Sequence, residues 1–302
     1  MDARLAVNLG FATNLYPEAE EYMRIVGEEL GLRSGMFVAD LLSMFYSDEV
    51  VDGEVARIRE LAARYRVTLE WVFTAAFTRV NHVCHPNPAM REEWVRYLIR
   101  LAQTGARLGS VGMGSHFGIL SMRDYLDEDR REEMTDIAIQ GWRRIAEAAK
   151  GFGLEYLVFE PMSVPREFGC TIASTHELLE RLNRDIAIPM RLCLDVDHGD
   201  VASEDPRDID PYVWLEEFGA VSPVVHIKQA SANKSRHWPF TAEYNKRGII
   251  RPEKVLASLE KGGAKDAALI IECNWRERTP TDYRVVSDLK ESVDYWRQWV
   301  KE

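Results

Sequence analysis

With 302 residues and a hydrophobic fraction of 46%, the chain has the size and apolar content of one large globular domain, which we expect to cover residues 1–302. Its formal net charge of −11 argues against a nucleic acid as partner, because nucleic-acid binding needs a clustered basic surface. A small anionic ligand remains compatible with this charge, since one basic pocket can coexist with an acidic exterior.

Short apolar runs alternate along the chain with longer segments of helical period. In chain order, the apolar runs predict eight strands, at residues 4–11, 32–39, 67–75, 108–115, 154–161, 190–197, 223–229 and 267–274. Apolar residues recur every three or four positions in the intervening segments, which include residues 17–31, 54–65, 91–109 and 131–153. Several of these segments end in Gly, as is common at the carboxyl end of a helix.

Strands that each lead into a helix imply parallel pairing between the strands. A (β/α)8 TIM barrel closes such a sheet without leaving an unpaired edge, and we expect this α/β fold, with the active site at the carboxyl ends of the strands. An open doubly wound sheet gives the same alternation. It is less compatible with the residues that follow the first strand, because NLGFATNL is not a glycine-rich dinucleotide loop.

Cysteine spacing and the amino-terminal residues bear on the compartment. The four cysteines show no C-x-x-C spacing, which favours a reducing environment. The segment MDARLAVNLGF lacks a basic region followed by a long apolar run, and no apolar segment reaches the length of a membrane span. We therefore expect a cytoplasmic protein with no membrane partner. The aromatic-rich segments DLLSMFY and REEWVRYL are candidates for the interface of a homo-oligomer.

Charged or imidazole groups close four of the predicted strands. Glu160 ends the fifth strand, Asp195 the sixth, His226 the seventh and Glu272 the eighth. Each follows an apolar run, at the edge of a low-dielectric core where it is costly to leave a polar group unpaired. Any one of them could simply cap its strand. Together, three carboxylates and one imidazole predict a site for one hard divalent ion such as Mn²⁺, Mg²⁺, Co²⁺ or Fe²⁺.

This set of strand ends resembles the xylose isomerase-like barrel superfamily and, within it, the ketose 3-epimerase branch. The resemblance is carried by VFEP around Glu160, LDVDH with Asp195 and His198, VVHIK around His226 and IIECN around Glu272. It implies that these two glutamates, with Asp195 and His226, hold a single divalent metal, and that His198 touches the substrate. The glutamates would also be the catalytic residues, accepting and donating the proton on opposite faces of a carbon next to a ketone.

Cations near the seventh strand bear on the kind of ketose. Two residues after His226, where free-hexulose epimerases tend to carry Glu, the chain has Lys228. The loop SANKSRHWPF and the motif EPMSVPRE add further cations and hydrogen-bond donors, which favour an anionic group on the substrate, although each alone could be a solvated loop charge. A phosphate could also meet backbone amides. The loop donors are Ser231, Asn233, Lys234 and Arg236. The predicted substrate-binding residues are His198, His116, Lys228, Arg166, Lys234 and Arg236.

Both motifs resemble those of xylose isomerase-like enzymes that epimerise erythrulose 1-phosphate at C3, which implies a sugar phosphate as substrate and Lys228, Lys234 and Arg236 as phosphate ligands. Alternatives remain open: an epimerase of a free ketose, and an aldose–ketose isomerase acting across C1 and C2. A two-metal xylose isomerase would need more carboxylates near Gln229, and an endonuclease IV-like enzyme would need more than these seven histidines and a basic groove. A non-enzymatic sugar-binding barrel would not need the metal set.

Overall fold

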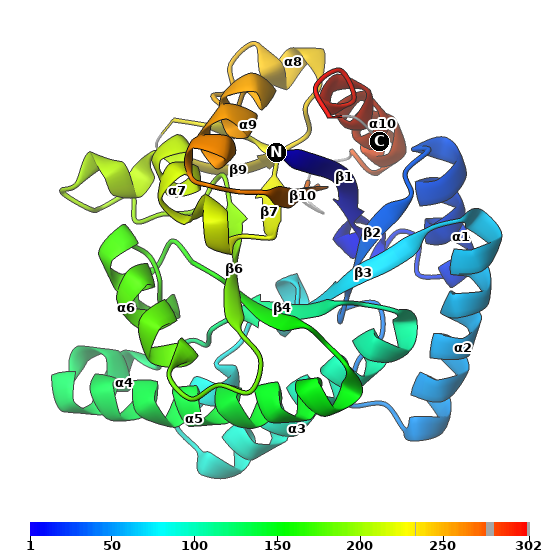
Figure 1. The fold of residues 1–302 in the computed structure, drawn as a ribbon. Coiled ribbons are helices and arrows are strands. Elements are labelled where there is room, and N and C mark those ends of the chain that lie inside the picture. The colour runs from blue at the N-terminus through cyan, green and yellow to red at the C-terminus, as the bar shows by residue number, and fades with distance from the viewer. Residues whose placement is uncertain (233, 276–280, 301–302) are drawn as a thin grey trace.

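Eight parallel strands close into a barrel in the computed structural model of the protein, and helices surround it (Figure 1). The structure describes residues 1–232, 234–275 and 281–300, without the side chains of residues 234 and 235. Around the ring the strands are β1 (Asp2–Asn8), β10 (Asp266–Ile271), β7 (Val224–Ile227), β6 (Met190–Asp195), β5 (Tyr156–Glu160), β4 (Gly112–His116), β3 (Thr68–Phe73) and β2 (Ser34–Val38). Pairing of β1 with β10 and with β2 closes the ring, so the predicted TIM barrel is confirmed.

The helices lie outside the barrel and follow the strands along the chain. They are α1 (Ala19–Arg24), α2 (Asp48–Tyr65), α3 (Pro88–Leu108), α4 (Met122–Leu126), α5 (Glu128–Phe152), α6 (Ile172–Asn183), α7 (Pro211–Phe218), α8 (Ala242–Asn245), α9 (Pro252–Lys261) and α10 (Val285–Trp296). The predicted helix at residues 17–31 divides into α1 and a π-helical turn, η2 (Ile25–Glu29). Single 3₁₀ turns are η1 (Leu9–Ala12), η3 (Ala76–Thr78), η4 (His82–Cys84), η5 (Pro165–Glu167), η6 (Pro206–Ile209), η7 (Gly219–Val221) and η8 (Asp282–Arg284).

Local capping explains where the long helices begin and end. The side chain of Asn87 accepts from the amide of the second residue of α3, and Asp127 accepts from the amide of the third residue of α5. Gly109 and Gly153 then end these helices in the left-handed conformation, with φ of 92° and 93°. The prediction from terminal glycines is therefore confirmed for α3 and α5. Arg66 takes the same conformation after α2, at φ 56°, without the freedom of a glycine.

Large side chains fill the barrel beneath the carboxyl ends of its strands. The buried cluster inside the ring consists of Ala6, Met36, Trp71, Phe73, Tyr156, Val158, Cys193, Val224, Ala268 and Ile270. β4 makes room for two of these rings because it carries glycine at two inward positions. A Cβ at Gly114 would lie 1.9 Å from Cε2 of Phe73, and a Cβ at Gly112 would lie 2.6 Å from Cε2 of Tyr156. Tightly packed side chains therefore fill the barrel directly beneath the site at the carboxyl end.

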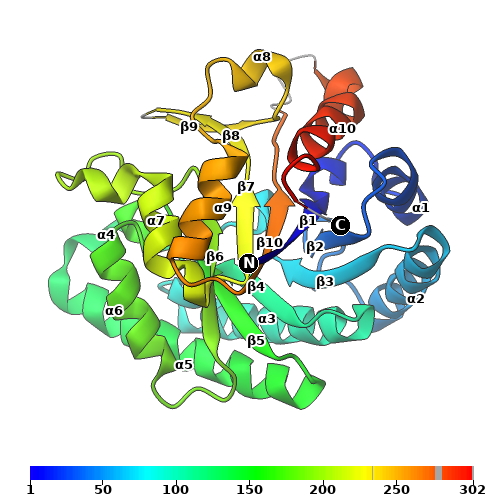
Figure 2. The ribbon, with the colours of Figure 1, turned by 45° about the horizontal axis from the view of Figure 1, so that its top comes forward.

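An antiparallel hairpin follows β7 where the sequence predicts a loop. Its strands are β8 (Gln229–Ser231) and β9 (Lys234–Trp238), and Figure 2 shows it beyond the carboxyl end of β7, near α8. These strands are short and mostly polar, so they lack the apolar alternation by which a strand is recognised. Tertiary contacts hold the hairpin instead: the Gln229 side chain donates to Asn245 Oδ1 at 2.9 Å and accepts from the Ile250 amide at 2.9 Å.

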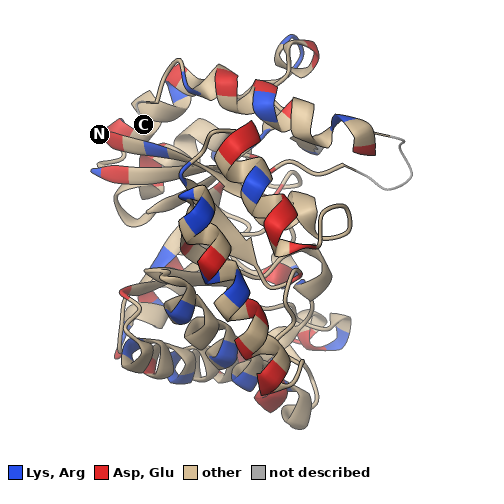
Figure 3. Cartoon of the chain, turned by 90° about the vertical axis from the view of Figure 1, so that its right-hand side faces the viewer, with Lys and Arg blue, Asp and Glu red and all other residues tan. Residues whose placement is uncertain are grey.

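Acidic and basic residues are interspersed along the outer helices on the side shown in Figure 3. Ion pairs link neighbouring helices elsewhere on the surface, such as Arg144 with Glu92 at 2.7 Å and Arg181 with Glu132 at 2.8 Å. Exposed pairs of this kind each contribute only ~0–1 kcal/mol. Among the described residues, none of the helices combines the length and apolarity needed to cross a membrane.

Candidate active site

Four strands bring the predicted metal ligands to one point at the carboxyl end of the barrel. Glu160 ends β5, Asp195 ends β6, His226 lies in β7 and Glu272 directly follows β10. One ligand atom from each of the four lies within 4.8 Å of the others. The sheet register explains this proximity, because Asp195 pairs with His226 and the Glu272 amide donates to the carbonyl of Ile227 at 3.0 Å.

His226 is fully buried, and its two ring nitrogens face different partners. Nδ1 lies 3.0 Å from Glu160 Oε1 and 3.5 Å from Glu272 Oε1, whereas Nε2 lies 3.3 Å from the thioether sulfur of Met36. Burial would lower the pKa of this imidazole, but Cys193, Glu272 and Glu160 outweigh burial and raise it well above its usual value. In the neutral ring, a proton on Nε2 would leave the Nδ1 lone pair directed at the carboxylates, where a cation would lie.

Lys228 lies between two of the carboxylates and is fully buried. Its ammonium donates to Asp195 Oδ2 and, at 2.6 Å, to Glu272 Oε2. Burial would lower the pKa of Lys228, but these two carboxylates raise it above its usual value. Burial likewise would raise the pKa of both carboxyls, but nearby imidazoles and Lys228 lower that of Asp195 well below its usual range and that of Glu272 to about 2. Where the sequence predicts a phosphate ligand, the structure therefore shows a counter-charge to two of the predicted metal ligands.

Two further hydrogen bonds orient the carboxylates. Asn8 Nδ2, at the end of β1, donates to Glu272 Oε1 at 3.0 Å, and the backbone amide of Asp197 donates to Asp195 Oδ1 at 2.8 Å. Hydrogen bonds of this kind fix the ligands of a metal site. Sequence reasoning misses Asn8, and also the Met36 that faces His226, because both lie within ordinary apolar runs.

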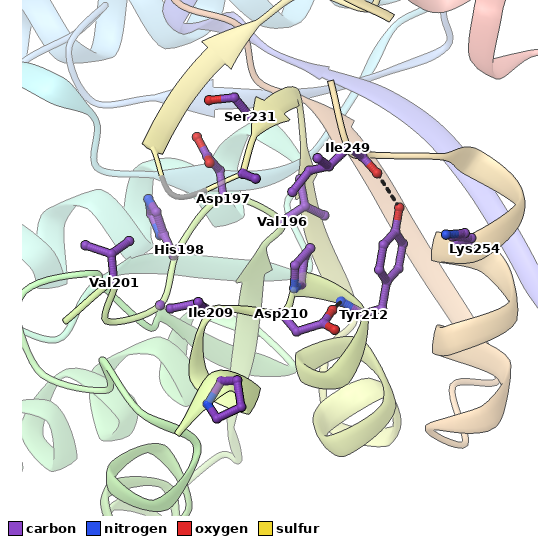
Figure 4. A pocket seen from close by; sticks show the side chains of 14 residues that line it. Val196, Asp197, His198, Val201, Ile209, Asp210, Tyr212, Ser231, Ile249 and Lys254 are labelled. Carbon is purple, nitrogen blue, oxygen red and sulfur yellow. Dashed lines mark hydrogen bonds between the residues drawn. The ribbon is translucent and has the colours of Figure 1, made fainter. Parts of the chain in front are cut away.

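His198 lines a cavity of about 440 Å³ (Figure 4) and also lies beside two of the carboxylates. Its Nδ1 lies 3.0 Å from the carbonyl oxygen of Pro161 and 3.6 Å from Glu160 Oε1, and its Nε2 lies 3.5 Å from Asp195 Oδ2. The cavity extends between the loop after β6, the hairpin and α9, and Lys254 lies at its α9 side. The structure thus places His198 beside open space, as a substrate-binding residue requires.

A third histidine, His237, reaches the same group of residues from β9. Its Nε2 lies 3.7 Å from Glu272 Oε2, and one ring nitrogen lies within 4.8 Å of ligand atoms of His198 and Asp195. Burial, with help from the ammonium of Lys228, lowers the pKa of His237 to about 4, so the ring is neutral at pH 7. Sequence reasoning misses His237 because it interprets SANKSRHWPF as a loop, and this short polar segment carries no local signal of a strand.

His116, predicted to line the pocket, is buried at the end of β4 in a different environment. Its Nε2 lies 2.8 Å from the carbonyl oxygen of Val80, and its ring packs 4.3 Å from that of His82. Burial lowers the pKa of His116 to about 4, and burial also lowers the pKa of His82. The two rings are therefore neutral and packed together at pH 7.

The predicted arginines make contacts of their own. Arg166 donates to the carbonyl oxygen of Leu120 at 2.6 Å, in the loop after β4. The guanidinium of Arg236 lies over the ring of Trp238, 5.4 Å from its centroid, and its Nε has no hydrogen-bond partner among the described residues. Two other candidates lie outside the described residues, namely Asn233 and the side chain of Lys234.

Comparisons with known proteins place the chain in a family. The sequence profile of the Xylose isomerase-like TIM barrel family matches residues 27–299. The chain belongs to this family. Its sequence is 36% identical to that of the D-erythrulose 1-phosphate 3-epimerase of Brucella abortus, over 98% of this chain and 96% of the relative. The family predicted from the strand-end motifs is thereby confirmed, and the protein is an isomerase.

Two solved structures share the whole fold. A xylose isomerase candidate from Rhodospirillum rubrum is 25% identical and superimposes with a TM-score of 0.88, covering 98% of this chain and 99% of that one. D-psicose 3-epimerase from Clostridium cellulolyticum is 13% identical, with a TM-score of 0.73 over 99% of this chain and 100% of that one. At such low identity, the similarity to D-psicose 3-epimerase is evidence for the barrel fold alone.

Proposed function

We propose that the protein is a divalent-metal-dependent sugar epimerase that inverts C3 of a small ketose phosphate such as erythrulose 1-phosphate. The observation that carries this proposal is the convergence of Glu160, Asp195, His226 and Glu272 within 4.8 Å. The Brucella relative, which is an epimerase of D-erythrulose 1-phosphate, supports both the reaction and the phosphorylated four-carbon substrate.

The donor set fits one hard divalent ion. Three carboxylates and an imidazole whose Nδ1 faces them offer the oxygen and nitrogen ligands that Mn²⁺, Mg²⁺ or Co²⁺ prefer. With all three carboxylates ionised, the Lys228 ammonium and a divalent ion bring the net charge of the site to zero, and the proton that one glutamate carries for the reaction makes it +1. When bound, the ion would polarise the ketone oxygen of the substrate and stabilise the negative charge that develops there.

Glu160 and Glu272 are the proposed proton-transfer residues. Their strands, β5 and β10, are separated in the ring by β6 and β7, so the two carboxylates come to Nδ1 of His226 from separate strands. One carboxylate would accept the C3 proton, and the other, in its protonated form, would return a proton to the opposite face. His198, 3.6 Å from Glu160, would donate a hydrogen bond to the substrate oxygen on which charge develops.

The phosphate contacts belong to cations outside this buried centre, since Lys228 is held by two carboxylates. Arg236 is the best-supported candidate, because its buried Nε has no partner among the described residues and an anion would supply one. Lys234, two positions earlier in β9, and Arg166 remain further candidates.

The reaction is tested by incubating the metal-loaded protein with tetrulose and pentulose phosphates and with free ketoses in deuterated water. Deuterium at C3 alone, with inversion seen by chiral chromatography, is the expected result. Deuterium at C1 would instead show an aldose–ketose isomerase. The similarity to the Rhodospirillum rubrum protein supports this alternative. Metal analysis of the purified protein should find one divalent ion per chain, and a fully active metal-free protein would contradict the mechanism.

A further inference from the structure

The β8–β9 hairpin carries one imidazole into the site. His237 lies in β9, and its Nε2 is 3.7 Å from Glu272 Oε2. Its side chain is 32% exposed, whereas the neighbouring Lys228 is fully buried. The ring therefore borders both a proposed proton-transfer carboxylate and accessible space.

Backbone hydrogen bonds on both sides fix the position of His237. The amide of Arg236 donates to Asp197 Oδ2 in the loop after β6, and the carbonyl oxygen of His237 accepts from the amide of Asn274 at 3.0 Å, after β10. Next to His237, the hairpin is thus hydrogen-bonded to the segments that follow two barrel strands, β6 and β10. A side chain used for recognition or catalysis needs a fixed position of this kind, because small displacements weaken its action.

The distance between His237 and Glu272 is too long for a hydrogen bond, so this contact does not account for the placement of the ring. The corresponding pair on the other side is similar, since His198 Nδ1 lies 3.6 Å from Glu160 Oε1. Each proposed proton-transfer carboxylate therefore has an imidazole beside it that retains hydrogen-bonding capacity toward a ligand.

We propose that His237 is a catalytic residue that hydrogen-bonds an oxygen of the ketose on the side served by Glu272, as the counterpart of His198 beside Glu160. The inference rests on the proposed epimerase function and adds to it a contact provided by the hairpin. A neutral imidazole can donate to a carbonyl oxygen or accept from a hydroxyl, which are the groups next to the reacting carbon of a ketose.

The alternative role for His237 is that of a ligand to a second metal ion, because His237, His198 and Asp195 also offer ligand atoms within 4.8 Å of one another. Asp195 is already a ligand of the ion proposed at Glu160, His226 and Glu272, so a second ion would have only the two imidazoles as ligands of its own. The geometry therefore favours the substrate as the partner of His237.

His237→Ala and the milder His237→Gln test the proposal, with His176→Ala as the matched control on the exposed surface of α6. All three proteins are loaded with Mn²⁺ and compared with the wild type for kcat/KM, metal content and thermal midpoint. We expect kcat/KM to fall by about 100-fold in His237→Ala, as for loss of one hydrogen-bond donor to developing charge, with a smaller fall in His237→Gln. Metal content should stay at the wild-type value, and His176→Ala should match the wild type.

Three results would overturn the inference. A kcat/KM within about threefold of the wild type in both His237 variants would show that the ring does not contact the substrate. Loss of metal in folded His237→Gln would make the residue a metal ligand. A wild-type protein that converts none of the ketoses would refute the proposed function and, with it, this inference, whereas an active wild type with unaffected variants refutes the inference alone.

Discussion

Two buried histidines lie near the carboxyl ends of barrel strands, His116 at the end of β4 and His226 in β7, and their surroundings differ. Nε2 of His116 faces a backbone carbonyl, and burial lowers its pKa to about 4. Nδ1 of His226 faces two carboxylates, which help to raise its pKa in spite of burial. The same residue type near the carboxyl end of a barrel strand therefore meets a backbone carbonyl on one side and two carboxylates on the other. The partner that a strand-end residue meets decides its role.

The largest effect should come from removing a carboxylate on the β7 side. Glu272→Gln keeps the shape of the side chain but removes the charge of a proposed metal ligand and proton-transfer group that is also a partner of Lys228. We expect kcat to fall by about 10²–10⁴-fold, measured as C3 inversion by chiral chromatography. The surface variant Glu260→Gln serves as the control. If Glu272→Gln kept the turnover rate of the wild type, the β7 side would no longer differ in function from the β4 side.

The second-largest effect should come from removing Lys228, the cation that balances the carboxylates on the β7 side. Lys228→Met leaves Asp195 and Glu272 buried without their ammonium, so the metal-free protein should lose about 3–5 kcal/mol in free energy of unfolding. Urea unfolding in the presence of a chelator measures the loss, with the exposed Lys261→Met as control. Added Mn²⁺ should restore part of it, because the ion supplies positive charge. Equal stability of variant and wild type without metal would contradict the counter-charge role.

On the β4 side, His116 should make the free energy of unfolding depend on pH in the acid range. Its pKa is about 4 in the folded protein and near 6.5 in the unfolded chain, so the unfolded chain binds the extra proton between these values. The free energy of unfolding should therefore fall as pH falls from 6.5 to 4, and His116 contributes up to about 3 kcal/mol of that fall. His116→Gln should flatten this part of the profile, measured by urea unfolding at several pH values. An unchanged slope would show that His116 is not held neutral.

The smallest effect is expected outside both regions. If Arg236 binds the substrate phosphate, Arg236→Gln should raise KM for a ketose phosphate by about tenfold, the loss of one charge-assisted hydrogen bond. KM for the corresponding free ketose should not change. Steady-state kinetics on the two substrates makes the comparison, and equal effects on both would exclude a phosphate contact at this residue.

The part of the site that follows from sequence consists of polar groups that end apolar strands. Glu160, Asp195, His226 and Glu272 are visible because each interrupts an apolar run, and a parallel barrel gathers such interruptions at one end. The eight barrel strands follow from the same pattern. His237 does not, because a short polar hairpin is held by tertiary hydrogen bonds that have no local signal.

Lys228 shows a second limit of sequence reasoning. A cation next to a metal-ligand strand predicts an anionic substrate, but sequence alone does not reveal that the nearest anions are two of the protein's own carboxylates. Asn8 and Met36 were hidden for a related reason. Their contacts with Glu272 and His226 join β1 and β2 to strands near the other end of the chain, and only closure of the barrel creates them.

The glycine at position 114 has a consequence for how this sequence can evolve. It admits the ring of Phe73, and that ring packs against His226 with centroids 5.5 Å apart. A larger residue at position 114 would displace Phe73 toward the imidazole of the proposed metal site, although β4 supplies none of the four proposed ligands. Because a Cβ at 114 would also meet Val158 Cγ2 at 2.6 Å, a larger residue at 114 should be tolerated only together with smaller ones at 73 and 158, an epistatic set that acts on the orientation of His226.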